Sequence, residues 1–175
     1  MTGSFRIGRN HYRFSGMALR EMLLETFVHM PPVKMLEGLS AADAARRPGD
    51  GVHSIVEILA HVNFWQTWWL NRCDGRVEPM VAAAKHGWPD AAAADWPRLC
   101  EEFTAGLHHA VALSEDGARL DMPITPAIEF PPLSHHTIRD GLMHVAQHNA
   151  HHLGQIVIVR QLIGQWPPPQ GSWTW

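Results

Sequence analysis

The sequence predicts an all-α protein, a four-helix bundle, and two observations support this class. Apolar residues recur every three or four positions in four long stretches, which is the spacing of one face of an α-helix. No stretch alternates apolar and polar residues strongly, as a β-strand exposed on one face does. Four such helices can bury their apolar faces only against one another, so we expect one bundle domain over residues 1–175.

The first helix is expected at about residues 14–30. It follows a polar stretch, residues 1–13, that is expected to form a loose N-terminal arm. Pro31 and Pro32 end the helix, because proline lacks the N–H that the helix needs. The residues that share its apolar face are Leu19, Leu23, Phe27 and Met30.

The second long helix is expected to begin at Ser54, because Ser54 and Glu57 have the spacing of a capping box. It runs to about Asn71 or Cys73. Before it we expect a short turn at residues 33–39 and a brief helix, capped by Ser40, that ends before Pro48. The apolar face of the long helix consists of Ile55, Ile58, Leu59, Val62, Trp65 and Trp69.

The third long helix is expected to begin at Asp95, because Pro97 suits the first helical turn, and to end by Asp116. A long connection, residues 75–94, precedes it. The proline-rich residues 118–134 that follow predict a crossing loop, with an extended piece at about residues 122–128. The apolar face of the helix consists of Trp96, Leu99, Cys100, Phe103, Leu107 and Val111.

The fourth long helix is expected at about residues 137–162, between capping signals near Thr137 and the helix-ending Gly164 and Pro167. The tail, residues 165–175, contains too much proline to be helical, and its three tryptophans are expected to pack on the bundle.

Composition excludes several classes of protein. With 175 residues, 46% apolar and 18% charged, the chain is globular. A net charge of −3 and the lack of a basic cluster argue against a nucleic-acid partner. No apolar run approaches the ~18 residues of a membrane span, and the first residues do not resemble a signal peptide, so we expect a soluble cytoplasmic protein with no membrane partner.

The 13 histidines are the outlying feature, and three of them predict a metal site. His144, His148 and His152 lie at i, i+4 and i+8, so they stack on successive turns of the fourth helix. Relative to the apolar face of that helix, His152 lies about 40° away, His148 about 80° and His144 about 120°. His148 and His152 are therefore the pair best placed to share an ion with another helix.

His61, at the edge of the apolar face of the second helix, is the expected third ligand. A single histidine is more often an ordinary core or surface residue, so the prediction depends on the combination. Three neutral imidazoles leave a coordination position open, which is typical of catalytic sites. Imidazole suits zinc, nickel and iron, and zinc is the first expectation.

Three further residues are candidates for contacts around the metal, although a catalytic residue is not identified. Glu57 could accept an imidazole N–H or act as a base, but its role in the capping box is the favoured interpretation. Asn149 points into the apolar face, so its amide needs a partner, either a neighbouring helix or a ligand. His144 could contribute a contact outside the ligand set.

The remaining histidines and the aromatic residues have simpler interpretations. Trp65, Trp68 and Trp69 have the spacing of core residues, although part of the cluster could wall an apolar pocket. Cys73 and Cys100 have no ligand-like spacing and are expected to be reduced thiols near the core. Surface or capping roles are expected for His53, His135, His136 and His151.

Two segments resemble the DinB-like (DinB/YfiT) family. The second helix of that family is similar to residues 54–65, SIVEILAHVNFW, together with the preceding stretch LEGLSAADAARRPGDGVHSI. Its fourth helix is similar to residues 144–162, HVAQHNAHHLGQIVIVRQL. The WPPP tail matches one subgroup. The resemblance covers most of residues 36–73 and 135–175, and little of residues 75–134. It implies a four-helix bundle with a divalent metal held by three histidines, which fall on His61, His148 and His152.

The resemblance also implies a range of functions. Members of the family often form homodimers, and relatives include thiol-dependent transferases and metal-dependent hydrolases. We therefore expect a metal-dependent enzyme acting on a small molecule, with a low-molecular-weight thiol as a candidate cosubstrate. The alternative is a non-catalytic, stress-associated metal-binding bundle that serves as an interaction module. A closed metal site or an exposed apolar patch would favour the alternative.

Overall fold

The structure, a computed structural model, describes residues 16–24 and 30–171. In this part of the chain it contains six α-helices, four short 3-10 turns and no β-strand, which confirms the predicted all-α class. The predicted N-terminal arm, together with Phe27, Trp173 and Trp175, lies outside the described residues.

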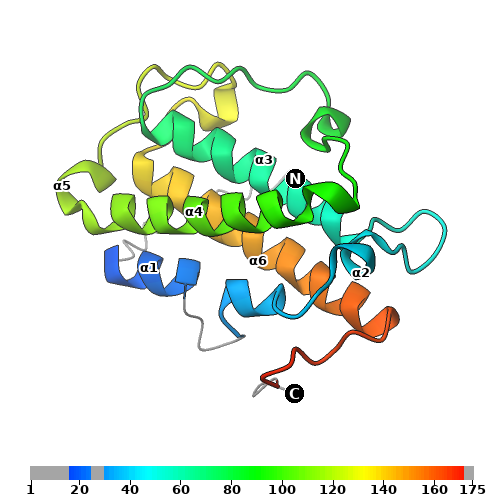
Figure 1. The fold of residues 1–175 in the computed structure, drawn as a ribbon. Helices are drawn as coiled ribbons and strands as arrows, with labels where there is room; N and C mark the ends of the chain where they lie inside the picture. Colours follow the sequence, from blue (N-terminus) through cyan, green and yellow to red (C-terminus); the bar gives the residue numbers. More distant parts are fainter. Residues whose placement is uncertain (1–15, 25–29, 172–175) are drawn as a thin grey trace, which may run out of the picture.

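Four helices form the bundle: α1 (Gly16–Leu24), α3 (Ile55–Cys73), α4 (Trp96–Glu115) and α6 (Ile138–Leu162). Figure 1 shows α4 lying across the bundle in front of α6, with α1 below it and α3 above. Two short helices, α2 (Ala41–Ala45) and α5 (Gly117–Leu120), stand before α3 and after α4. The predicted turn after Pro31 is a 3-10 turn, η1 (Pro32–Met35).

The side chains that cross between helices fix their directions. Cys73, at the end of α3, contacts the carbonyl of Ile138 at the start of α6, so these two helices are antiparallel. Asn63 and Gln66 of α3 donate to the carbonyls of Leu99 and Phe103 of α4, so α3 and α4 are parallel. The connection between two parallel helices must return along the bundle.

This connection, residues 74–95, contains the 3-10 turns η2 (Ala84–Gly87) and η3 (Ala93–Asp95). Its path back along α3 brings Gly87 and Trp88 against His61, in the first half of that helix. The long connection that the sequence predicted therefore contributes to the surroundings of the candidate site.

The helix starts follow the predicted capping signals. The backbone N–H and hydroxyl of Ser54 both donate to Glu57, each over 2.8 Å, and Thr137 forms the equivalent box with Asp140. Ser40 caps α2 by accepting from the N–H of Asp43. Each box satisfies N–H groups that a helix start leaves without partners, which explains why the predicted and observed starts agree.

The apolar core has two parts, one toward each end of the bundle, and a group of buried polar side chains lies between them. One part packs the start of α3 and α4 against the end of α6, and the other packs the end of α3 and α4 against α1 and the start of α6. The buried polar residues on α3 and α6 at the intermediate level are His61, Asn63, Gln66, Asn149 and His152.

Three segments differ from the sequence expectation or extend it. Residues 122–128 form no strand: Pro123 makes a single bridge with Thr137, because prolines at 123 and 126 cannot donate to a ladder. Met30 is buried but lies outside α1. The tail packs on the bundle through Trp166, whose ring lies 5.7 Å from the guanidinium of the buried Arg160.

Candidate metal centre

Three histidine side chains converge between α3 and α6. His61 comes from α3, and His148 and His152 come from successive turns of α6. One ligand nitrogen of each residue lies within 4.8 Å of the other two, and within the described residues this is the one group of three or more potential ligands. His61 and His152 are each 6% exposed, and His148 is half-buried. The structure thus brings together the set that helical spacing selected.

The Nε2 atoms of His61 and His148 lie 3.2 Å apart. The Nδ1 atom of His61 is 2.6 Å from the carbonyl oxygen of Gly87, so Nδ1 must donate, and Nε2 is left as a bare acceptor. Two nitrogens bound to one tetrahedral ion at about 2.0–2.1 Å would lie roughly 3.3 Å apart. The observed separation therefore fits a shared ion.

The third imidazole is oriented in a similar way. Nδ1 of His152 donates to the side-chain oxygen of Gln155 over 2.7 Å, which leaves its Nε2 as the acceptor. Metal-binding histidines commonly donate their second N–H to such an oxygen, which fixes the tautomer and the ring. Nδ1 of His148 is buried without a hydrogen-bond partner among the described residues.

The electrostatics of the site favour neutral imidazoles. Burial lowers the pKa of His61 to about 4 and, together with the neighbouring His152 and His61, lowers the pKa of His148 to about 3. Burial also lowers the pKa of His152, against the effect of its bond to Gln155. All three rings are therefore uncharged at neutral pH, the state that a metal ligand requires.

Trp88 covers one side of the site. Its ring stacks between His53 and His61, at centroid distances of 4.1 and 3.8 Å, and meets His152 edge-on at 5.9 Å. Gly87 allows the connection to pass close to Trp65 of α3, because a Cβ there would lie 2.6 Å from Nε1 of Trp65. His53 is exposed, as predicted, but is also part of the stack.

Gly87, Trp88 and Gln155 belong to the site but were not predicted from the sequence. Gln155 follows His152 by three residues, a helical-neighbour spacing that could have revealed it. Gly87 acts through its backbone carbonyl, which no residue pattern marks, and Trp88 lies in an irregular connection without periodicity.

The further candidates make contacts elsewhere. His144 does not join the group: its Nε2 lies 2.9 Å from Nε2 of His136, and its ring stacks on Trp69 at 4.4 Å. His136 is therefore half-buried and paired rather than a simple surface residue. Burial lowers the pKa of His144, and the proximity of His136 adds to this.

Glu57 serves the start of α3. Burial raises the pKa of its carboxyl group, but hydrogen bonds from Ser54 and the charge of Arg47 outweigh this and lower it. Its described hydrogen bonds go to Ser54 and Arg47, and His53 lies 3.8 Å away. The described contacts thus place it in the capping box, which was the favoured interpretation.

Asn149 belongs to a buried chain of amides. It donates to the side-chain oxygen of Gln66 over 2.8 Å, and Gln66 donates to the carbonyl of Phe103 over 3.1 Å. These bonds join α6, α3 and α4, so the partner of Asn149 is a neighbouring helix. Gly106 makes room for the chain, because a Cβ there would lie 2.0 Å from Nε2 of Gln66.

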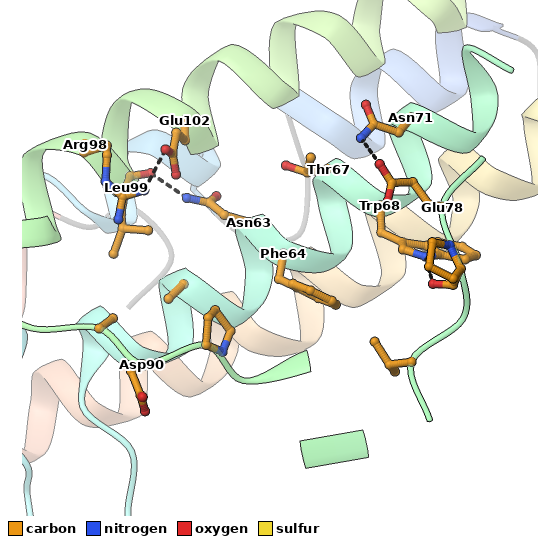
Figure 2. A pocket seen from close by; sticks show the side chains of 15 residues that line it. Asn63, Phe64, Thr67, Trp68, Asn71, Glu78, Asp90, Arg98, Leu99 and Glu102 are labelled. Atoms are coloured by element: carbon orange, nitrogen blue, oxygen red, sulfur yellow. Dashed lines mark hydrogen bonds and ion pairs between the residues drawn. The ribbon is translucent and has the colours of Figure 1, made fainter. Parts of the chain in front are cut away.

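The tryptophan cluster lies largely in the core. Trp68 and Trp69 are buried in the second apolar part, and Trp68 also lines a groove of about 510 Å³ between α3, α4 and residues 78–91. Figure 2 shows this α3–α4 groove, with Asn71 bonded to Glu78 and Arg98 to Glu102 at its edges. None of the three converging histidines lines it.

The donor set fits a divalent transition ion, because three neutral imidazole nitrogens converge and two of the rings are fixed through Nδ1. Fold and site together define a helical bundle with a three-histidine group that could hold a metal.

The chain belongs to the DinB superfamily, whose family description matches residues 33–156. This range includes all three histidines and confirms the resemblance seen in the sequence. Comparison with curated proteins found no match, and neither did comparison with solved structures. None of the helices in the described part of the chain is long and apolar enough to cross a membrane.

Proposed function

We propose that this chain binds one divalent transition ion through His61, His148 and His152, and that it is a metal-dependent enzyme of the thiol transferase or hydrolase type. Zinc is the first candidate, and nickel and iron are the alternatives. The observation that carries the proposal is the convergence of three neutral imidazoles, two buried and one half-buried, with one ligand nitrogen from each within 4.8 Å of the others.

Three protein ligands leave room for a further ligand on the ion. A divalent ion with such a position supplies Lewis acidity, which lowers the pKa of a water or thiol and polarises a substrate oxygen. The residues of the chain hold and orient this centre: Gly87 and Gln155 fix the rings, and Trp88 excludes water from one side.

The properties of the cysteines favour an external thiol over an internal one. Burial raises the pKa of Cys73 to about 12 and that of Cys100 to about 11, so neither residue is a thiolate at neutral pH. A thiol nucleophile would therefore come from a low-molecular-weight cosubstrate.

The second candidate is a non-catalytic metal-binding bundle that acts as an interaction module and forms a homodimer, as members of the family often do. The exposed apolar side chains of Val52, Ile158 and Leu162 favour it, with exposed fractions of 40%, 55% and 65%.

Metal analysis combined with an activity screen separates the two candidates. Protein purified without a His tag should contain about one ion per chain. The loaded protein should hydrolyse p-nitrophenyl esters or consume a small thiol in the presence of an electrophile. The double variant His148→Ala, His152→Ala should lose both ion and activity, whereas His135→Ala, at an exposed position, should keep both. An ion without any activity would support the second candidate.

A further inference from the structure

A second groove, of about 530 Å³, lies next to two residues that contact the candidate metal centre, although none of the three converging histidines lines it. It is bounded by residues 51–53, by Trp88 and by the second half of α6. We name it the α6 groove. Its apolar lining consists of Val52, Ile58, Trp88, Ile158, Val159 and Leu162.

The α6 groove carries no Asp, Glu, Lys or Arg in its lining; its polar side chains are those of His53, His151 and Gln155. The α3–α4 groove, by contrast, is lined by four charged residues. Burying a charged ligand in an apolar groove without a partner charge is costly, whereas an uncharged apolar ligand gains from the same lining. The lining of the α6 groove therefore selects neutral, apolar groups.

Two of its residues are shared with the metal centre. Trp88 faces the groove and stacks on His61 at 3.8 Å, and Gln155 lines the groove while accepting from His152. A molecule in the groove would therefore lie directly against the residues that hold the ligand imidazoles in place.

The described part of the tail lies elsewhere. Gln170 forms hydrogen bonds with Lys34 and Glu37, and neither of these residues lines the α6 groove. Ile158 and Leu162 remain exposed at 55% and 65%, so the described chain leaves the groove accessible.

We propose that the α6 groove binds the uncharged, apolar part of the substrate whose reacting group is processed at the three histidines. This inference rests on the proposed enzymatic function and adds the substrate class: a molecule with a neutral alkyl, acyl or aromatic portion. Trp88 forms the wall between that portion and His61.

Gly154 provides a direct test, because it lines the groove and a Cβ built there meets nothing within 4 Å. Gly154→Leu should fill the groove without disturbing the fold, and Gly154→Ala controls for the change in backbone freedom. Thr67→Leu, which adds a similar apolar side chain at an exposed position of the α3–α4 groove, is the matched control.

The first measurement is binding of N-phenyl-1-naphthylamine, a neutral fluorescent probe, compared with the anionic 8-anilinonaphthalene-1-sulfonate. The neutral probe should bind more tightly to the wild-type protein. Gly154→Leu should weaken its binding by about tenfold or more, while Gly154→Ala and Thr67→Leu should change it by less than about threefold. Unchanged zinc content in all variants shows that the metal centre is intact.

The second measurement uses p-nitrophenyl esters of increasing acyl length. In the wild-type protein kcat/KM should rise with acyl length, and Gly154→Leu should abolish the rise. Neutral-probe binding that depends on Gly154, without any activity, would contradict the enzymatic function but leave the groove assignment standing. Esterase activity whose dependence on acyl length is unchanged in Gly154→Leu would overturn the groove assignment but not the enzymatic function. A dimer that excludes the probe and becomes monomeric in Gly154→Leu would also overturn it, because a second copy would then fill the groove.

Discussion

The Nε2 atoms of His61 and His148 face each other across the α3–α6 interface at 3.2 Å, although these residues lie 87 positions apart. His61 has its proton on Nδ1, bonded to Gly87, so its Nε2 offers a lone pair toward His148. A bound cation would satisfy both nitrogens at once.

The three converging histidines should contribute much more to zinc affinity than His144 does. His61→Ala and His152→Ala should each remove most of the zinc affinity, measured by competition with a chelator. His144→Ala should cost at most roughly 10–100-fold, the range typical of residues that contact a ligand rather than the ion, because His144 pairs with His136. Far-UV circular dichroism should show helical metal-free protein throughout, since the apolar core does not depend on the ion. Loss of zinc in His144→Ala but not in His152→Ala would contradict the ligand set.

Metal should be retained at lower pH than the sequence alone suggests. The ordinary histidine pKa of ~6.5 predicts release below about pH 6. Burial lowers the pKa of His61 to about 4 and that of His148 to about 3, and it also lowers the pKa of His152, so protons compete with the ion at a lower pH than for ordinary histidines. We expect zinc to remain bound at pH 5 when release is followed with a colorimetric chelator. Half-release near pH 6 would show that the imidazoles are more exposed to water than in this structure.

The same shifts predict how the stability of the metal-free protein depends on pH. These pKa values are lower in the folded than in the unfolded chain, so below about pH 6.5 the unfolded chain binds more protons. The free energy of unfolding should therefore fall as the pH is lowered from 7 toward 4. Thermal unfolding with a chelator present measures this dependence. His148→Gln should reduce the slope of the unfolding free energy against pH, because one titrating ring with a lowered pKa is removed. Equal slopes in both proteins would contradict the burial of His148.

Gln155 should tune the metal centre without binding the ion. Gln155→Leu removes the acceptor for Nδ1 of His152, and loss of such a contact typically weakens metal binding by roughly 10–100-fold. Gln155→Glu, which keeps an acceptor at that position, should restore most of the affinity. Gln161→Leu, at an exposed position of α6, is the control and should leave affinity unchanged. Equal zinc affinities for the Gln155→Leu variant and the wild type would show that Gln155 does not contribute to metal binding.

Two glycines inside helices should respond to alanine in opposite directions. Gly154→Ala should stabilise the protein by about 0.5–1 kcal/mol, because alanine favours the helix and its Cβ meets nothing within 4 Å. Gly106→Ala should destabilise by about 1–3 kcal/mol, because its Cβ would lie 2.0 Å from Nε2 of Gln66 and displace the buried amide chain. Urea unfolding of both variants tests this, and a stabilised Gly106→Ala variant would show that Gln66 can move aside at little cost.

The sequence by itself determined the helices and the two elements that carry the histidines. Capping boxes at Ser54 and Thr137 act within four residues, so the starts of α3 and α6 could be predicted from adjacent residues. The i, i+4 spacing of His148 and His152 is a local property of the helix, and the position of His61 beside the apolar face indicated which way it points. Metal binding by these residues stays a prediction.

Only the tertiary structure decided what surrounds them. The carbonyl of Gly87 and the ring of Trp88 reach His61 because α3 and α4 are parallel and the connection must return along the bundle. The pairing of His144 with His136, and of Asn149 with Gln66, likewise depends on how separate elements pack. Hydrogen bonds within a helix depend on neighbouring residues, whereas the path of an irregular connection is set by the surface of the assembled helices, which no local pattern encodes.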